Sequence, residues 1–106
     1  MSDLTRTDVI KLIDSDKIKY FRGLNLEGVD LSDLDLSGAL LSGANLKGAN
    51  LRGANLIEAE LYGADLRNAD FTSANLRKAN LRSSYINGTD FTNADLTDAI
   101  FFMCIK

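Results

Sequence analysis

The chain has 106 residues, which is enough for a single domain. Its formal net charge of −3 is small and has the wrong sign for a nucleic-acid ligand. The chain contains no histidine, which excludes Ser-His-Asp and Cys-His catalytic systems and removes the commonest metal ligand.

The sequence also indicates a compartment. Residues 1–6 are polar and lack the basic start and apolar stretch of a signal peptide. There is no apolar run of about 18 residues, so no membrane contact is expected. The one cysteine, Cys104, cannot form an internal disulfide, which is typical of a reducing compartment. We therefore expect a cytoplasmic protein.

Residues 1–23 do not repeat and are predicted to cap the domain. Thr5 followed by Asp8 is a weak form of the capping box, and it predicts a short helix over residues 5–14. The apolar residues of this segment are Val9, Ile10, Leu12 and Ile13. We expect the helix to cover an open end of the structure that follows, and a partner-binding amphipathic helix is the alternative.

From Leu24 onward the chain repeats every five residues. Every fifth residue from Leu26 to Phe101 is large and apolar, and these residues form the centre column. Two residues before each centre lies a second apolar column, which is mostly alanine. Asn or Asp stands between the two columns in 12 of 16 repeats, and a variable residue and often glycine follow the centre.

This pattern predicts a coiled chain with an apolar interior. Residues two apart point to the same side of an extended segment, and glycine and asparagine favour a turn because they tolerate positive φ. A period of five fits neither an α-helix nor a heptad coiled coil, and the large centre residues argue against disorder. The predicted structural core includes Leu46, Leu51, Leu56, Leu61, Leu66, Phe71, Leu76 and Leu81.

The Ala-(Asn/Asp)-Leu-x-x units between Ala39 and Asp98 resemble the pentapeptide-repeat family, and the similarity covers residues 24–103. The resemblance implies an all-β fold, a right-handed four-sided parallel β-helix with one pentapeptide per side and about four coils. It also implies that Asn and Asp side chains hold the turns through hydrogen bonds to the backbone. The expected organisation is a capping segment (1–23), a solenoid (24–103) and a tail (104–106).

Residues twenty apart should stack on one face of such a solenoid. The second and third faces then carry net charges of −3 and −2. The fourth face comprises residues 39–43, 59–63, 79–83 and 99–103, and it lacks Asn or Asp at three positions. Exposed apolar residues that cluster usually mark a contact surface, although scattered ones are normal. The candidate interaction surface is Leu40, Ile57, Tyr62, Ile100, Phe102 and Met103.

The C-terminal end is a second candidate, because five of the last seven residues are large and apolar. Either this end docks on another copy of the chain or the short tail covers it. The resemblance favours the first arrangement, since end-to-end dimers through the C-terminal coils recur in family members with longer solenoids. A homodimer through the C-terminal coil would have two-fold symmetry.

No enzymatic activity, cofactor or metal is expected. Carboxylate pairs such as Asp33 and Asp35 lie on a filled, narrow solenoid without a pocket to shift their pKa. We expect a structural or protein-interaction module with an unidentified protein partner and no direct nucleic-acid binding. The family resemblance adds an alternative, a DNA mimic that binds a type II topoisomerase to inhibit gyrase or protect it from quinolones. Arg52, Arg77 and Lys78 interrupt the acidic faces that this alternative needs.

Overall fold

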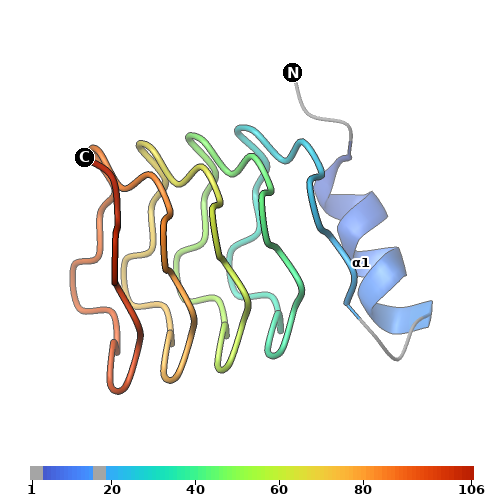
Figure 1. The fold of residues 1–106 in the computed structure, drawn as a ribbon. Helices are drawn as coiled ribbons and strands as arrows, with labels where there is room; N and C mark the ends of the chain where they lie inside the picture. Colours follow the sequence, from blue (N-terminus) through green and yellow to red (C-terminus); the bar gives the residue numbers. More distant parts are fainter. Residues whose placement is uncertain (1–3, 16–18) are drawn as a thin grey trace.

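The computed structural model describes residues 4–15 and 19–106. The chain forms a tower of stacked coils, and one helix, α1 (Arg6–Ser15), lies across the N-terminal end of the tower (Figure 1). The C-terminus lies at the opposite end. Within the described ranges, no helix is long and apolar enough to cross a membrane.

A constant register holds the coils together. Each parallel bridge joins residues twenty positions apart, from Tyr20 with Leu40 to Tyr85 with Ile105. In the described part of the chain the bridges are isolated pairs and not extended strands, because a turn follows every short side. One coil therefore takes four pentapeptides, which is the four-sided arrangement that the resemblance implies.

The bridges extend beyond the predicted solenoid span of 24–103 at both ends. At the start, Phe21 lies five residues before Leu26 and is only 1% exposed, so it acts as one more centre residue. At the other end, Ile105 continues the coil and does not fold back as a separate tail. The period of five thus continues before residue 24 and after residue 103, where the alanine and leucine columns are no longer present.

One repeat, Asn45 to Ala49, shows how the local structure follows from the sequence. The N–H of Ala49 donates to the carbonyl of Leu46 at 3.0 Å, which closes a four-residue turn. Gly48, the third residue of this turn, has φ of 68°, a value that glycine adopts without steric cost. The side-chain oxygen of Asn45 accepts the N–H of Lys47 at 3.0 Å. In the part of the chain that the structure describes, Asn or Asp side chains hold twelve turns in this way.

The core is a stack of centre residues lined by the alanine column. All eight predicted core residues are 0% exposed: Leu46, Leu51, Leu56, Leu61, Leu66, Phe71, Leu76 and Leu81. Backbone hydrogen bonds between coils accompany this burial, as in the 2.8 Å bond from the N–H of Leu46 to the carbonyl of Asp65. Apolar burial is the main stabilising contribution to such a fold.

Helix α1 closes the N-terminal end of this core. The N–H of Thr5 donates to the carboxylate of Asp8 at 3.0 Å, and the N–H of Asp8 donates to the Thr5 hydroxyl at 3.2 Å. This reciprocal capping pair starts the helix one residue later than the predicted range. Val9 is 1% exposed and belongs to the same buried cluster as Phe21, so the helix covers the first coil.

Candidate interaction surface

The two ends of the tower differ in how their interiors are covered. At the first coil, Phe21 and Leu26 are each 1% exposed, because α1 packs over them. At the last coil, the equivalent centre residues are only partly buried, namely Ile86, Phe91, Leu96 and Phe101. In residues 4–15 and 19–106 nothing covers this end, so the C-terminal coil leaves part of the core open to solvent.

The backbone of the last coil is open as well. One coil earlier, the N–H of Phe71 donates to the carbonyl of Asp90 at 2.7 Å, and Leu76 and Leu81 make equivalent bonds. Within the described residues, the corresponding N–H groups of the last coil have no backbone acceptor, namely those of Phe91, Leu96 and Phe101. An unpaired coil edge of this kind is a template for another chain.

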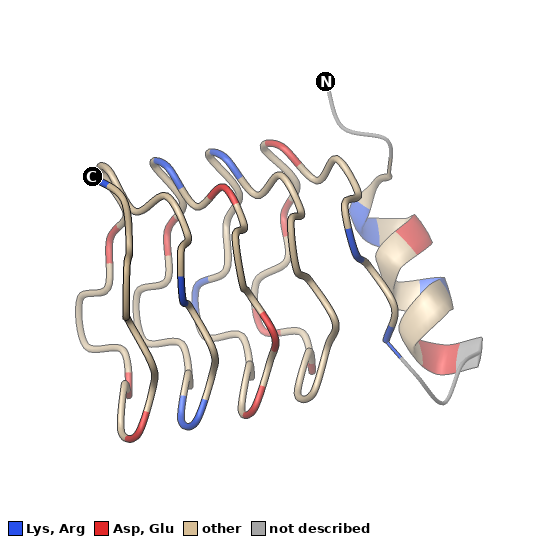
Figure 2. Ribbon diagram, in the orientation of Figure 1, with Lys and Arg blue, Asp and Glu red and all other residues tan. Residues whose placement is uncertain are grey.

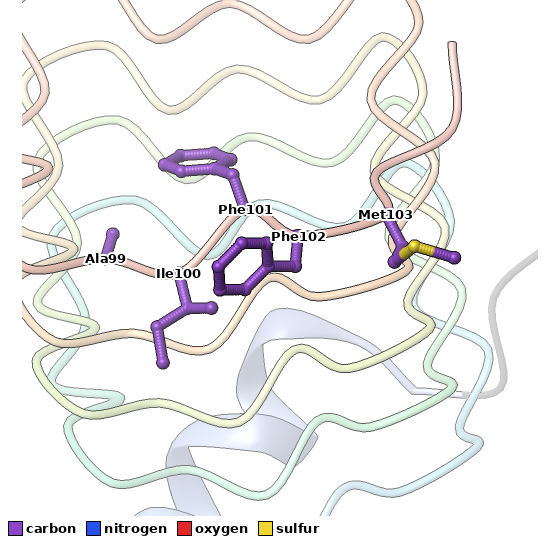
Figure 3. Close-up of a pocket in the computed structure, with 5 residues that line it drawn as sticks. All are labelled: Ala99, Ile100, Phe101, Phe102 and Met103. Carbon is purple, nitrogen blue, oxygen red and sulfur yellow. The ribbon is translucent and has the colours of Figure 1, made fainter.

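An apolar hollow of about 510 Å³ lies at this end and is lined by residues 99–103. Figure 3 shows Ala99 and Phe101 on one side of the segment and Ile100 and Phe102 on the other. Phe102 and Met103 are 72% and 79% exposed, more than any other large apolar side chain described. The end therefore offers an accessible apolar contact.

Aromatic packing supports the open end from inside. The rings of Phe71 and Phe91 stack at 5.4 Å between centroids, one coil apart. Phe101 meets Phe91 edge to face at 6.0 Å. Such pairs contribute about 0.5–1.5 kcal/mol beyond area burial. The last coil thus has packed rings beneath its exposed surface.

The fourth face carries a row of aromatic and arginine side chains along the tower axis. In the structure this face also includes residues 19–23, which the sequence analysis placed in the capping segment. The Arg22 guanidinium lies over the Tyr20 ring at 5.7 Å, and that of Arg82 lies over Tyr62 at 5.9 Å. We call Tyr20, Arg22, Tyr62, Arg82 and Phe102 the arginine–tyrosine stripe.

The structure divides the predicted surface residues into two groups. Tyr62, Ile100, Phe102 and Met103 are exposed, whereas Leu40 and Ile57 are half-buried. Four exposed residues lie outside the predicted six-residue surface: Leu12, Tyr20, Tyr85 and Ile105. Ile105 belongs to the apolar C-terminal end, which is the second candidate predicted from the sequence. For Tyr85 a signal existed, since the three earlier residues of its column are Asn25, Asn45 and Asp65.

Half of the acidic residues of the second and third faces, four of eight, form ion pairs within the described part of the chain. Ion pairs join Arg6 to Asp30, Lys19 to Asp35, Arg52 to Asp70 and Arg77 to Asp95 at 3.1–3.4 Å. Figure 2 shows both signs of charge scattered along the coils. These pairs break up the acidic rows on which a DNA mimic would depend.

Local hydrogen bonds keep these carboxylates ionised. The Thr97 hydroxyl donates to Asp95 at 2.6 Å, and this bond, followed by the Thr97 N–H, lowers the pKa of Asp95 below its ordinary value. Ser37 and Thr72 lower the pKa of Asp35 and Asp70 in the same way. Such acids hold turns and do not act as proton donors near neutral pH. Among the described residues no cluster of acids or cysteine is arranged to hold a metal ion.

Comparisons with known proteins agree with this architecture. The family model for pentapeptide repeats matches residues 35–72 and 74–101 in 8 copies. No curated protein sequence matches the chain.

Two solved cyanobacterial structures are similar. HetL is a pentapeptide repeat protein involved in heterocyst differentiation regulation in Nostoc sp. strain PCC 7120. It is 42% identical with a TM-score of 0.73, and the match covers 76% of this chain and 38% of HetL. Rfr23, a pentapeptide repeat protein of Cyanothece 51142, is 34% identical with a TM-score of 0.54, over 85% of this chain and 65% of Rfr23. The chain spans less than two thirds of the length of either protein. Because the family model matches more than half of its residues, the chain belongs to the pentapeptide-repeat family.

Proposed function

We propose that this chain is a non-enzymatic protein-interaction module, in which the solenoid presents the arginine–tyrosine stripe and the C-terminal coil to a protein partner. One observation carries the proposal. The structure describes eight exposed large apolar residues, and seven of them lie on the fourth face or on the adjoining edge of the first face. These seven are Tyr20, Tyr62, Tyr85, Ile100, Phe102, Met103 and Ile105, and the eighth is Leu12 of α1.

This segregation is what a contact surface requires. Tyrosine, phenylalanine, methionine and arginine are enriched in protein interfaces, and a contiguous exposed apolar patch usually marks one. The second and third faces instead expose Asp, Ser and Thr side chains that are used in turns. A scaffold whose backbone is already ordered also avoids the entropic cost of ordering a loop on binding.

We further propose that the open C-terminal coil pairs with a second copy of the chain. Its unpaired N–H groups share the edge with the carbonyls of Thr89, Ala94 and Ala99, which accept no backbone bond within the described residues. Because donors and acceptors alternate on one edge, the edge is complementary to itself under a two-fold axis.

Light scattering over a concentration series tests this second-copy contact. We expect a dimer that Phe102→Asp and Met103→Asp weaken strongly, because each places a charge in the contact. Ser73→Asp on the second face is the matched control and should leave the dimer unchanged. A chain that stays monomeric at the highest concentration contradicts self-association through this end.

Partner capture tests the module itself. The wild-type chain and the double variant Tyr62→Asp with Phe102→Asp are used as bait in the same extract, and bound proteins are quantified by mass spectrometry. We expect proteins that the wild type retains and the double variant loses. Equal retention by both baits would contradict the proposed surface.

A further inference from the structure

Building on the proposed function, we propose that the arginine–tyrosine stripe binds an acidic, apolar segment of a partner protein. In this complex, two carboxylates of the partner about 14 Å apart pair with Arg22 and Arg82, and an apolar side chain between them contacts Tyr62.

The arginines of the chain separate into two groups by their partners. Of the six arginines in the sequence, four form ion pairs: Arg6, Arg52, Arg67 and Arg77. Arg22 and Arg82 form none with any carboxylate of residues 4–15 and 19–106, and both are exposed on the fourth face. The two guanidinium groups that pair with no carboxylate of the described residues are therefore those of the arginine–tyrosine stripe.

The chain itself shows how a stacked arginine accepts a carboxylate. Arg67 lies over the ring of Tyr85 at 5.9 Å and donates two hydrogen bonds to Asp65, at 2.9 Å from Nε and 2.7 Å from Nη2. A guanidinium that stacks on a ring by its flat face keeps its N–H edge free for a two-pronged contact. Arg22 and Arg82 each lie over a ring in the same way, but no described residue supplies a carboxylate to either of them.

The residues around Arg82 do not supply this carboxylate. Asp65 stands two residues before Arg67, whereas the same position before Arg82 holds Asn80. Glu60, on the neighbouring coil, accepts a hydrogen bond from the Asn80 amide at 3.1 Å and forms no ion pair with Arg82. An external carboxylate is therefore needed to complete the arrangement that Arg67 already has.

The spacing of the stripe defines the segment. Arg22 and Arg82 are sixty residues apart, so their backbone positions are separated by three coils or about 14 Å along the axis. In an extended segment, residues i and i+4 point to one side and lie about 13 Å apart. A Glu-x-Leu-x-Glu segment thus matches both arginines, and its leucine lies over the surface around Tyr62. The other four arginines already hold carboxylates of the chain, which restricts the segment to this face.

NMR titration tests the inference directly. The ¹⁵N-labelled chain is titrated with the synthetic peptide Ser-Glu-Ser-Leu-Ser-Glu-Ser and with the same peptide carrying Gln for Glu. We expect shifts confined to the fourth face, including the Nε–H signals of Arg22 and Arg82, and much weaker binding of the Gln peptide. Arg22→Gln and Arg82→Gln should each reduce the affinity for the acidic peptide about fivefold, as loss of an exposed ion pair does. Arg52→Gln, on the second face, should not.

Three results would overturn the inference. The chain could bind both peptides with equal affinity, or its NMR signals could remain unchanged at millimolar acidic peptide. Alternatively, an oligothymidine could shift the fourth-face signals while the acidic peptide does not. None of them decides the proposed function. If Phe102→Asp still abolishes self-association, or the capture experiment still separates the two baits, the interaction module stands and only its acidic ligand is wrong.

Discussion

Shortening a centre residue tests whether the stacked interior stabilises the tower. Leu56 is 0% exposed and lies between Leu36 and Leu76, the centre residues one coil away on either side of the same face. We expect Leu56→Ala to lower the free energy of unfolding by about 2–5 kcal/mol, because it removes buried methyl groups and leaves a cavity between rigid neighbours. Leu96 stands on the same face at the open end and is only partly buried. Leu96→Ala should cost about 1–2 kcal/mol, since part of its side chain already meets water.

Urea unfolding followed by circular dichroism measures both losses. The two variants delete the same atoms from the same column. The difference between their losses in free energy of unfolding therefore measures the effect of the coil that covers Leu56 and is missing beyond Leu96. Protein concentrations at which light scattering shows a monomer keep self-association out of the comparison. Equal losses under these conditions, or a loss below about 1 kcal/mol for Leu56→Ala, would refute the reasoning.

Three further predictions concern the turns and the cap. Gly48→Ala should cost about 1–2 kcal/mol in urea unfolding, because φ is 68° while no atom lies within 4 Å of the added methyl group, and Gly48→Asn should cost less. Thr97→Val removes the hydroxyl that lowers the pKa of Asp95, so NMR titration should show this pKa rising toward its ordinary value of about 3.9. A carboxyl group whose pKa is lowered by folding stabilises the fold above its ordinary pKa, and this stabilisation is lost as pH falls through the pKa of the folded state. The variant should therefore be less stable than the wild type at neutral pH. The difference in stability between the two should disappear in acid. Thr5→Ala should cost about 1 kcal/mol in thermal unfolding, since it removes half of the capping pair of α1.

Most of the fold follows from the sequence because the fold is periodic. The five-residue spacing of Leu46, Leu51 and Leu56 already determines which side chains lie inside. The Thr5–Asp8 pair also predicted the start of α1 to within one residue. The first turn of the solenoid lies outside the predicted span, because Lys19 stands there in place of alanine, although Phe21 and Gly23 keep the period.

The turns show a second limit. Glycine or asparagine is expected where φ is positive, yet Glu58 and Lys78 both adopt φ of 60°. Neighbouring coils impose this conformation, as the N–H of Glu58 donates to the carbonyl of Arg77 at 2.9 Å. Tertiary hydrogen bonds thus outweigh a local preference of about 1–2 kcal/mol.

The candidate surface was only partly predictable. A twenty-residue offset relates Tyr62 to Arg82, so their proximity was implicit in the period. Arg67 contacts Tyr85, which is 18 and not 20 residues later, and Leu40 is half-buried. Both features depend on how side chains turn at each corner, which periodicity does not describe.

The constant twenty-residue offset between bridged partners gives this protein the equivalent of a reading frame. Inserting one residue at any turn would exchange inward for outward positions in every later coil. Inserting five would keep the interior intact but rotate all later side chains by one face, which would remove Arg82 and Phe102 from the row that begins at Arg22. Only a change of twenty residues preserves both. Such a chain can therefore gain or lose length only in whole coils if its surface is to stay aligned.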